Sequence, residues 1–138
     1  MKVVTLGTFD ILHAGHIKLL KFCKELGEVV VGLNTDDFVL KFKGKKPIMS
    51  YEERRETLKE FGIDMILSNT QEGGDAKGVI LASGASFIVV GSDWATKDYI
   101  GQIGVTWEWL EENNIGICYF PRSLPMSTTI IKERVKNG

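Results

Sequence analysis

His13 and His16 are the only histidines in the 138-residue chain, and they stand three positions apart at the end of the run Gly-Thr-Phe-Asp-Ile-Leu-His-Ala-Gly-His at positions 7–16. A β-branched run precedes this segment and a helical apolar pattern follows it, so we expect a strand, a glycine turn and a helix. If the helix begins near Ala14, both imidazoles lie over the end that presents unpaired backbone N–H groups. Such an end attracts anions, phosphate above all. The pair therefore predicts chemistry on a phosphate-bearing ligand.

Two further segments carry candidate residues. Lysines cluster at positions 41–46, and most such runs are solvated loops, so the residues alone favour a loop over a binding site. Arg122 precedes Ser127 and Thr128, which stand at the start of a predicted helix. A serine there is usually a helix cap, but hydroxyl groups beside a helix N-terminus also suit a phosphate.

The elements that must position these residues follow from the hydrophobic periodicity. Strands are predicted at residues 3–6, 28–33, 65–68, 87–91 and 117–120. Helices are predicted at residues 15–26, 35–40, 51–61, 76–83, 105–113 and 128–136. This alternation is typical of an α/β protein with a parallel sheet covered by helices on both faces. We expect a Rossmann-like, doubly wound fold with five strands in the order 3-2-1-4-5.

Composition points to one soluble domain over residues 1–138, because 43% of the residues are apolar, 25% are charged and the formal net charge is −1. No apolar run approaches the roughly 18 to 20 residues that span a bilayer, and the first residues do not resemble a signal peptide. We therefore expect a cytoplasmic protein with no nucleic-acid or membrane partner. Cys23 and Cys118 have apolar neighbours and are predicted to be buried, reduced thiols.

Ligands of doubly wound sheets bind at the carboxyl ends of the strands, where the strand order reverses. Strands 1 and 4 flank that crevice in the expected order. The histidine segment leaves strand 1, and Gly-Ser-Asp-Trp at positions 91–94 leaves strand 4. Asp93 either forms the turn there or accepts a hydrogen bond from a bound base.

Several motifs resemble those of a known family. Gly-Thr-Phe-Asp at 7–10 with His-x-Gly-His at 13–16, and Ser-Thr-Thr at 127–129, resemble the two signatures of the HxGH nucleotidyltransferase superfamily. The cytidylyltransferase branch of the glycerol-3-phosphate type is the most similar. The resemblance covers nearly the whole chain, and it includes Tyr-Glu-x-Arg at 51–54 and the arginine at position 122.

The resemblance implies that a nucleoside monophosphate passes from a nucleoside triphosphate to a phosphate monoester, with release of pyrophosphate. CTP is the expected donor, glycerol 3-phosphate is the leading acceptor, Mg²⁺ is held mainly by the triphosphate, and a homodimer is expected. An acceptor oxygen attacks the α-phosphorus directly, so the protein has to position and neutralise charge.

The resemblance also assigns roles to individual residues. Those expected to act in catalysis are His13, His16, Lys45 and Arg122. Those expected to bind the nucleotide are Gly7, Thr8, Phe9, Gly15, Asp93, Arg122, Ser127 and Thr128. Those expected to bind the acceptor are Asp10, Lys43, Lys45 and Arg54, and no residue is assigned to a metal. Asp10 has a second interpretation, in which it holds the turn after the first strand.

Two segments leave alternatives open. Ser-Leu-Pro-Met at 123–126 stands where these cytidylyltransferases carry Thr-Glu-Gly-Ile, so the base is open between CTP and ATP. One alternative is an adenylyltransferase of the same superfamily that acts on a sugar phosphate or flavin mononucleotide. Another is a nucleotide-binding regulatory module without turnover. Residues 97–105 are predicted to form a lid over the acceptor or an added surface that selects the phosphate monoester.

Overall fold

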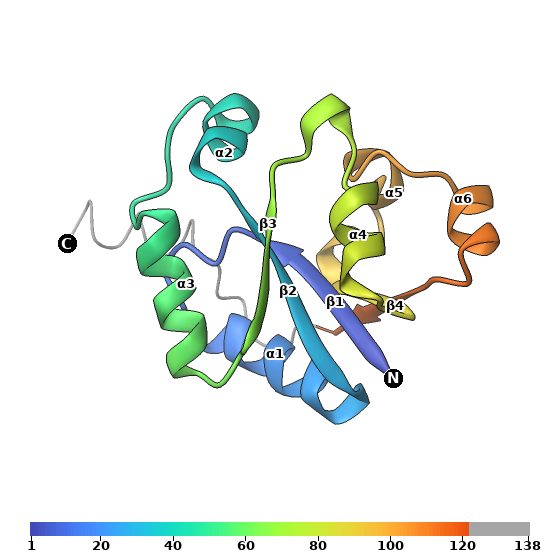
Figure 1. Ribbon diagram of the computed structural model, residues 1–138, viewed down its shortest axis with the longest axis horizontal. Coiled ribbons are helices and arrows are strands. Elements are labelled where there is room, and N and C mark those ends of the chain that lie inside the picture. Colours follow the sequence, from blue (N-terminus) through green and yellow to red (C-terminus); the bar gives the residue numbers. More distant parts are fainter. Residues whose placement is uncertain (122–138) are drawn as a thin grey trace.

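A computed structural model describes residues 1–121 of the chain (Figure 1). Its strands are β1 (Lys2–Gly7), β2 (Glu28–Asn34), β3 (Met65–Asn69), β4 (Phe87–Gly91) and β5 (Gly116–Phe120). Its α-helices are α1 (Ala14–Leu26), α2 (Asp36–Lys43), α3 (Tyr51–Glu60), α4 (Lys77–Ser83), α5 (Tyr99–Gln102) and α6 (Trp107–Glu112). Two short 3-10 turns, η1 (Glu72–Gly74) and η2 (Ser92–Trp94), follow β3 and β4. The predicted helix at 128–136 lies outside the described residues.

The strands form one sheet in the order β3-β2-β1-β4-β5, and every neighbouring pair is parallel. The predicted α/β class and strand order are therefore confirmed. β1 is the central strand, with β2 along one side and β4 along the other. β2 and β3 are added on one side of β1, and β4 and β5 on the other. The strand order therefore reverses at β1, and its carboxyl end is the switch point.

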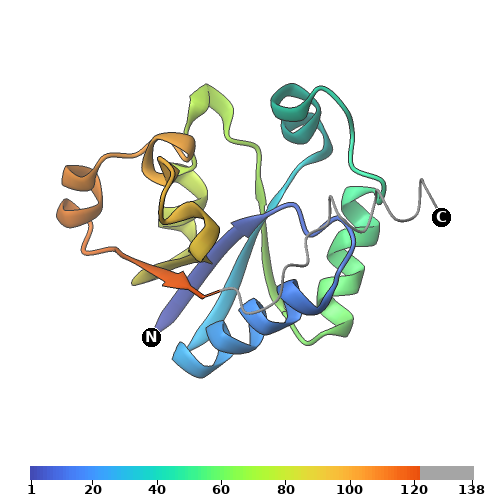
Figure 2. The same cartoon turned by 180° about the vertical axis from the view of Figure 1, so that it is seen from behind.

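Side chains alternate between the two faces of the sheet, as the period-2 pattern of a strand requires. Val4 and Ile88 belong to a buried cluster with Ile80 of α4, whereas Val3 and Val89 pack with Cys23 of α1. Figures 1 and 2 show α1 and α3 on one face and α4, α5 and α6 on the other. Both faces are covered, so the sheet is held in place from both sides.

Of the two interpretations of residues 97–105, the added surface is wrong, whereas a part in covering or selecting the acceptor stays a prediction. The side chains of Tyr99, Ile100, Ile103 and Val105 are buried in the cluster that contains Val4. Their apolar surface forms part of the core under α4, since burying large apolar side chains is what stabilises this layer. The helix predicted at 105–113 is correspondingly shorter and begins at Trp107, which is 61% exposed.

The cysteines agree with the prediction in part. Cys23 is buried, Cys118 is partly buried, and both are free thiols. Burial, followed by the neighbouring Cys118, raises the pKa of the Cys23 thiol to about 12. Cys23 is therefore an inert core residue at neutral pH.

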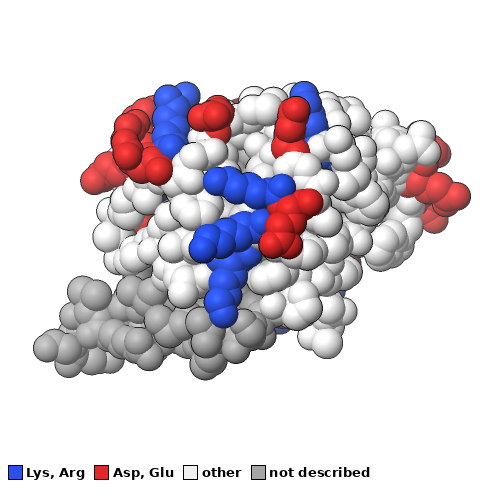
Figure 3. Space-filling view, turned by 90° about the horizontal axis from the view of Figure 1, so that it is seen from below, with Lys and Arg blue, Asp and Glu red and all other residues white. Residues whose placement is uncertain are grey.

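Charges of both signs share the face of the molecule that is seen from below. Basic side chains gather in its middle, and acidic side chains lie next to them and along its edge (Figure 3). Helix α1 lies on this side of the molecule and exposes Lys18, Lys21 and Lys24. In the part of the chain that the structure describes, no helix is long and apolar enough to cross a membrane.

Candidate active site

Two adjacent hollows open at the carboxyl end of β1, and both include Gly7, Thr8 and Trp94 in their walls. The histidine hollow is about 130 Å³ in volume and is lined also by Phe9, His16 and Asp93. The amide hollow is about 200 Å³ in volume. Its polar lining consists of Asn34, Asn69, Gln71, Gln102 and Lys43, and its aromatic lining of Phe38, Phe42 and Tyr99. Both hollows lie where ligands of doubly wound sheets bind.

The two histidines cap helix α1 with their side chains. His13 is the N-cap residue, and its Nδ1 accepts a hydrogen bond of 3.0 Å from the backbone N–H of Gly15. The Nδ1 of His16 accepts a bond of 3.4 Å from the backbone N–H of His13. A neutral imidazole that accepts at Nδ1 carries its proton on Nε2. Each ring in this arrangement therefore carries its proton on Nε2, and the rings stack with their centroids 3.9 Å apart.

The turn between β1 and α1 holds Phe9 in an unusual backbone conformation. Phe9 has a φ of +49°, in the left-handed region that non-glycine residues rarely adopt. Its ring lies 5.1 Å from the His16 ring, and a Cβ added to Gly7 would come within 2.9 Å of it. Gly7 is therefore needed where the Phe9 ring folds back over the strand end. Strain of this kind is often kept at functional sites.

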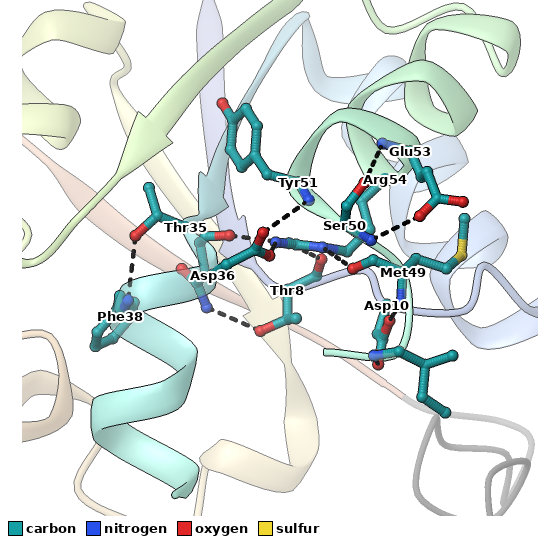
Figure 4. Close-up of polar contacts among 12 residues, drawn as sticks. Thr8, Asp10, Thr35, Asp36, Phe38, Met49, Ser50, Tyr51, Glu53 and Arg54 are labelled. Atoms are coloured by element: carbon teal, nitrogen blue, oxygen red, sulfur yellow. Dashed lines mark hydrogen bonds and ion pairs between the residues drawn. The ribbon is translucent and has the colours of Figure 1, made fainter. Parts of the chain in front are cut away.

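Asp10 fixes the segment that joins α2 to α3. Its two carboxylate oxygens accept backbone N–H bonds of 2.9 Å from Ile48 and 2.8 Å from Met49 (Figure 4). The side chain is only 2% exposed. These bonds join Asp10 to the segment before α3 and not to the turn after β1. Its predicted roles in that turn and at the acceptor both stay predictions.

Arg54 lies beneath the hollows, and its side chain is fully buried. Its NH1 donates to the carbonyl oxygens of Thr8 at 2.7 Å and Asn34 at 2.9 Å, and its Nε donates to that of Met49 at 3.1 Å. Its NH2 bonds Asp36 at 2.8 Å (Figure 4). The predicted phosphate contact of Arg54 does not fit this geometry, because the guanidinium is buried and bonded to acceptors of the protein itself. It is a positioning residue that ties three segments of the chain together.

The predicted basic residues are placed unequally. Lys43, the last residue of α2, lines the amide hollow. Lys45 is exposed two residues further on, beyond Gly44, and belongs to the lining of neither hollow. The structure therefore brings Lys43 to the site and leaves Lys45 at its approach.

Asp93 and Trp94 follow β4 in the turn η2, and both line the histidine hollow as the sequence pattern predicts. Asp93 and His16 line the same hollow, one from the turn after β4 and the other from α1. Three other predicted site residues, Arg122, Ser127 and Thr128, lie outside the described residues.

The sequence interpretation missed the carboxamide residues of the second hollow. Asn34 and Asn69 are the last residues of β2 and β3, and the strand register pairs them directly. Gln71 has a φ of +47°, and its Nε2 donates to the carbonyl oxygen of Gln102 at 2.8 Å. The signal that could have found them is a polar residue directly after an apolar strand, at the edge where ligands bind.

Fold and site together define an α/β nucleotide-binding protein with two imidazoles at the start of the helix that follows its first strand, of which His16 lines the histidine hollow. Residues 4–134 match the cytidylyltransferase-like family. A glycerol-3-phosphate cytidylyltransferase of Bacillus subtilis (strain 168) is 37% identical over 137 residues, which cover 97% of this chain and 96% of the relative. The chain belongs to the cytidylyltransferase-like family, and it is a nucleotidyltransferase.

Two further similarities bear on this assignment. A solved structure described as the lipopolysaccharide core biosynthesis protein from Thermoplasma volcanium GSS1 has a TM-score of 0.68 and 27% identity, over 89% of this chain and 96% of that one. An FAD synthase of Thermococcus sibiricus is 55% identical over 60 residues, which are 43% of this chain and 40% of the relative. The fold is thus shared over nearly the full length, while the FAD synthase similarity is high but local.

Proposed function

We propose that the protein transfers CMP from CTP to a phosphate monoester, with glycerol 3-phosphate as the leading acceptor, and releases pyrophosphate. An oxygen of the acceptor phosphate forms a bond to the α-phosphorus of CTP. The bond from that phosphorus to the bridging oxygen breaks, and pyrophosphate leaves with the electron pair. The product is a CDP-alcohol. The Bacillus subtilis relative, matched over nearly both full lengths, supports this substrate pair.

The observation that carries the proposal is the pair of capped imidazoles. Backbone N–H groups occupy both Nδ1 atoms, so the rings are held in place and their protons are on Nε2. His16 lines the histidine hollow, and we propose that its Nε2–H donates to the reacting phosphate, with His13 stacked against it. Donors fixed in advance stabilise charge that builds up on phosphoryl oxygens in the transition state, and they need no reorganisation when it forms. The chain needs no nucleophile of its own for this reaction.

The two hollows suit the two substrates. The histidine hollow takes the nucleotide, with its reacting phosphate at His16 and its base near Asp93 and Trp94, and the amide hollow takes the acceptor. Lys43 then neutralises the acceptor phosphate. Arg122, Ser127 and Thr128 are proposed to contact the triphosphate, as their match to the family motif implies.

Mg²⁺ is proposed to arrive with the triphosphate. Among residues 1–121, no group of three or more His, Cys, Asp or Glu side chains is placed to hold a metal ion. Mg²⁺ prefers oxygen ligands and keeps several of its waters, so we expect its ligands to be mostly nucleotide oxygens and water. The ion would neutralise charge on the leaving pyrophosphate.

A second candidate is transfer of AMP from ATP to flavin mononucleotide. Two observations favour it: the local 55% identity to the FAD synthase of Thermococcus sibiricus, and the aromatic wall that Phe38, Phe42, Trp94 and Tyr99 give the amide hollow. Aromatic side chains suit a flat ring better than a small polyol.

The decisive experiment offers the protein each nucleoside triphosphate with Mg²⁺ and a panel of phosphate monoesters that includes glycerol 3-phosphate and flavin mononucleotide. Pyrophosphate release is measured, and the nucleotide product is identified by mass spectrometry. CDP-glycerol is the expected product. FAD from ATP would establish the second candidate instead, and nucleotide binding without turnover in any combination would point to a regulatory module. Light scattering on the same sample measures whether the protein is the proposed homodimer.

A further inference from the structure

Three polar side chains from three different segments form a hydrogen-bonded chain on the floor of the amide hollow. Asn69 Nδ2 donates to Asn34 Oδ1 at 2.9 Å, and Asn34 Nδ2 donates to Thr8 Oγ1 at 3.1 Å. Asn69 ends β3, Asn34 ends β2, and Thr8 directly follows β1. This hydrogen-bonded chain therefore runs across the carboxyl edge of the sheet and ends at Thr8, one of the residues that the two hollows share.

These hydrogen bonds run in one direction, from Asn69 to Thr8, and that direction decides whether the Thr8 hydroxyl accepts or donates. A carboxamide has one accepting oxygen and one donating nitrogen, so an Asn34 that accepts from Asn69 must turn its nitrogen towards Thr8. The Thr8 oxygen then accepts from Asn34. Its own proton has to point away from Asn34, which leaves the hydroxyl as a donor.

The surroundings hold this chain in place. Asn69 is only 3% exposed, so its carboxamide cannot exchange its partner for bulk water. The buried NH1 of Arg54 bonds the backbone carbonyl oxygens of both Thr8 and Asn34. Thr8 and Asn34 are therefore fixed relative to each other through their backbones as well as their side chains.

We propose that Asn34 and Asn69 are positioning residues that orient the Thr8 hydroxyl as a hydrogen-bond donor to a phosphate oxygen of the bound triphosphate. Thr8 and His16 both line the histidine hollow, so the donor would lie near the reacting phosphate. The expected effect on kcat rests on the proposed nucleotidyl transfer. The binding effect requires only an anionic phosphate chain at this place. A preoriented neutral donor costs no reorganisation when charge forms next to it.

The test reverses the direction of the chain without changing its size. Asn34→Asp puts an acceptor on both sides of position 34, so the Thr8 hydroxyl must donate to the new carboxylate. Asn69→Asp accepts from Asn34 instead, which turns the Asn34 oxygen towards Thr8 and has the same result one residue further away. Gln102→Glu places a carboxylate on the wall of the same hollow outside the chain, and it measures the effect of charge alone.

Two readouts are needed. The first is the affinity for inorganic tripolyphosphate by calorimetry, a probe without a base or an acceptor. The second is kcat, with KM for the acceptor, on the substrate pair that the wild-type protein turns over. We expect Asn34→Asp and Asn69→Asp to weaken tripolyphosphate binding about 10-fold more than Gln102→Glu does, and to lower kcat by about 10- to 100-fold with little change in acceptor KM. Thermal melts check that each variant folds.

A double-mutant cycle with the threonine decides whether the asparagines act through it. Thr8→Val should lower the affinity for tripolyphosphate and the kcat about as much as Asn34→Asp does. Thr8→Ser should keep both near the wild-type values. Beyond the effect of charge, Asn34→Asp should cause no further loss in the Thr8→Val background.

Fully additive effects of Asn34→Asp and Thr8→Val would overturn the proposal, as would wild-type behaviour of Thr8→Val. Failure of the wild-type protein to bind tripolyphosphate would overturn it as well. If the wild-type protein transfers no nucleotide but binds tripolyphosphate, the proposed function fails while the binding readout still decides the role of the asparagines.

Discussion

The two hollows share Gly7, Thr8 and Trp94, yet they are built in different ways. The histidine hollow takes its imidazole and its strained Phe9 from one continuous run of sequence, with a second wall from the turn after β4. The amide hollow draws its polar groups from the ends of β2 and β3, from α2, from Gln71 just before η1 and from α5. The first is a local motif, and the second exists only once the sheet has formed.

This difference suggests a division of roles, in which the histidine hollow determines the type of reaction and the amide hollow determines the substrate. Donors fixed by a local motif suit a step that is the same for every substrate, which here is charge stabilisation at phosphorus. A wall assembled from several segments can change one residue at a time without disturbing the motif. Fold-level and motif-level resemblance therefore support the transfer chemistry more firmly than the acceptor.

Loss of Arg54 should have the largest effect, because both hollows depend on it. Arg54→Met leaves the carbonyl oxygens of Thr8, Asn34 and Met49 and the carboxylate of Asp36 without their donor. Removing one partner from a buried charged network costs about 3 to 5 kcal/mol in unfolding free energy. Urea denaturation measures it.

The matched control is Arg55→Met, on the same helix, where the side chain is only half-buried and the expected loss is below about 1 kcal/mol. An Arg54→Met protein that keeps its stability but loses affinity for the acceptor would restore the phosphate contact that the sequence predicted. It would also show that Arg54 does not hold the walls of the two hollows in place.

Arg54 illustrates what the sequence could predict and what it could not. The strand order, the helix that the histidines cap and the Asp93 turn follow from periodicity and local motifs, which depend on nearby residues. Whether an arginine is buried depends on three carbonyl groups from separate segments, and a single sequence does not bring these together. The phosphate contact of Arg54 comes from its match to the family motif, and a motif does not show whether the side chain is buried.

The amide hollow was missed for a related reason. The predicted strands ended at residues 33 and 68, one residue short of Asn34 and Asn69. Strand ends are the least certain part of a prediction from periodicity, because a polar terminal residue fits a loop equally well. The register that pairs the two asparagines depends on the whole sheet, and no local pattern encodes it.

Removing the His16 imidazole should affect only the histidine hollow. His16→Ala is expected to lower kcat by at least roughly 100-fold, or about 2.7 kcal/mol, with little change in acceptor KM. His16→Gln keeps one N–H donor and should retain part of the rate. Steady-state kinetics with both substrates varied gives the two constants separately. Near-wild-type turnover by His16→Ala would remove the ring from the mechanism.

The lysines test the amide hollow in the same way. Lys43→Ala should raise acceptor KM about 10-fold and leave kcat nearly unchanged, because one charge-assisted hydrogen bond is worth about 1.5 kcal/mol. Lys45→Ala should have the smaller effect, since Lys45 lines neither hollow. Lys41→Ala, on the exposed side of α2, is the control for the loss of a positive charge. A larger effect at Lys45 than at Lys43 would show that the loop closes over the substrates.

The smallest expected effect is at Tyr99, in the wall of the amide hollow. Its ring packs edge-on against Trp94 with the centroids 5.4 Å apart, and its hydroxyl is buried without a hydrogen-bond partner among the described residues. Removing a buried, unbonded hydroxyl is close to neutral or slightly stabilising. Tyr99→Phe should therefore change the unfolding free energy at pH 7 by between 0 and about +1 kcal/mol.

The gain at Tyr99→Phe should grow above pH 10. Burial, followed by the neighbouring Tyr119, raises the pKa of Tyr99 above its ordinary value of 10.0. The unfolded chain then loses this proton at a lower pH than the folded protein does, so wild-type stability falls as pH rises through that range. The Phe variant lacks this loss, and urea denaturation at pH 8 and pH 10.5 compares the two. A loss of stability in the variant would show that the hydroxyl has a hydrogen-bond partner. A gain in stability together with a higher acceptor KM would instead show that the Tyr99 hydroxyl binds the acceptor. The amide hollow would then have a specificity contact of its own.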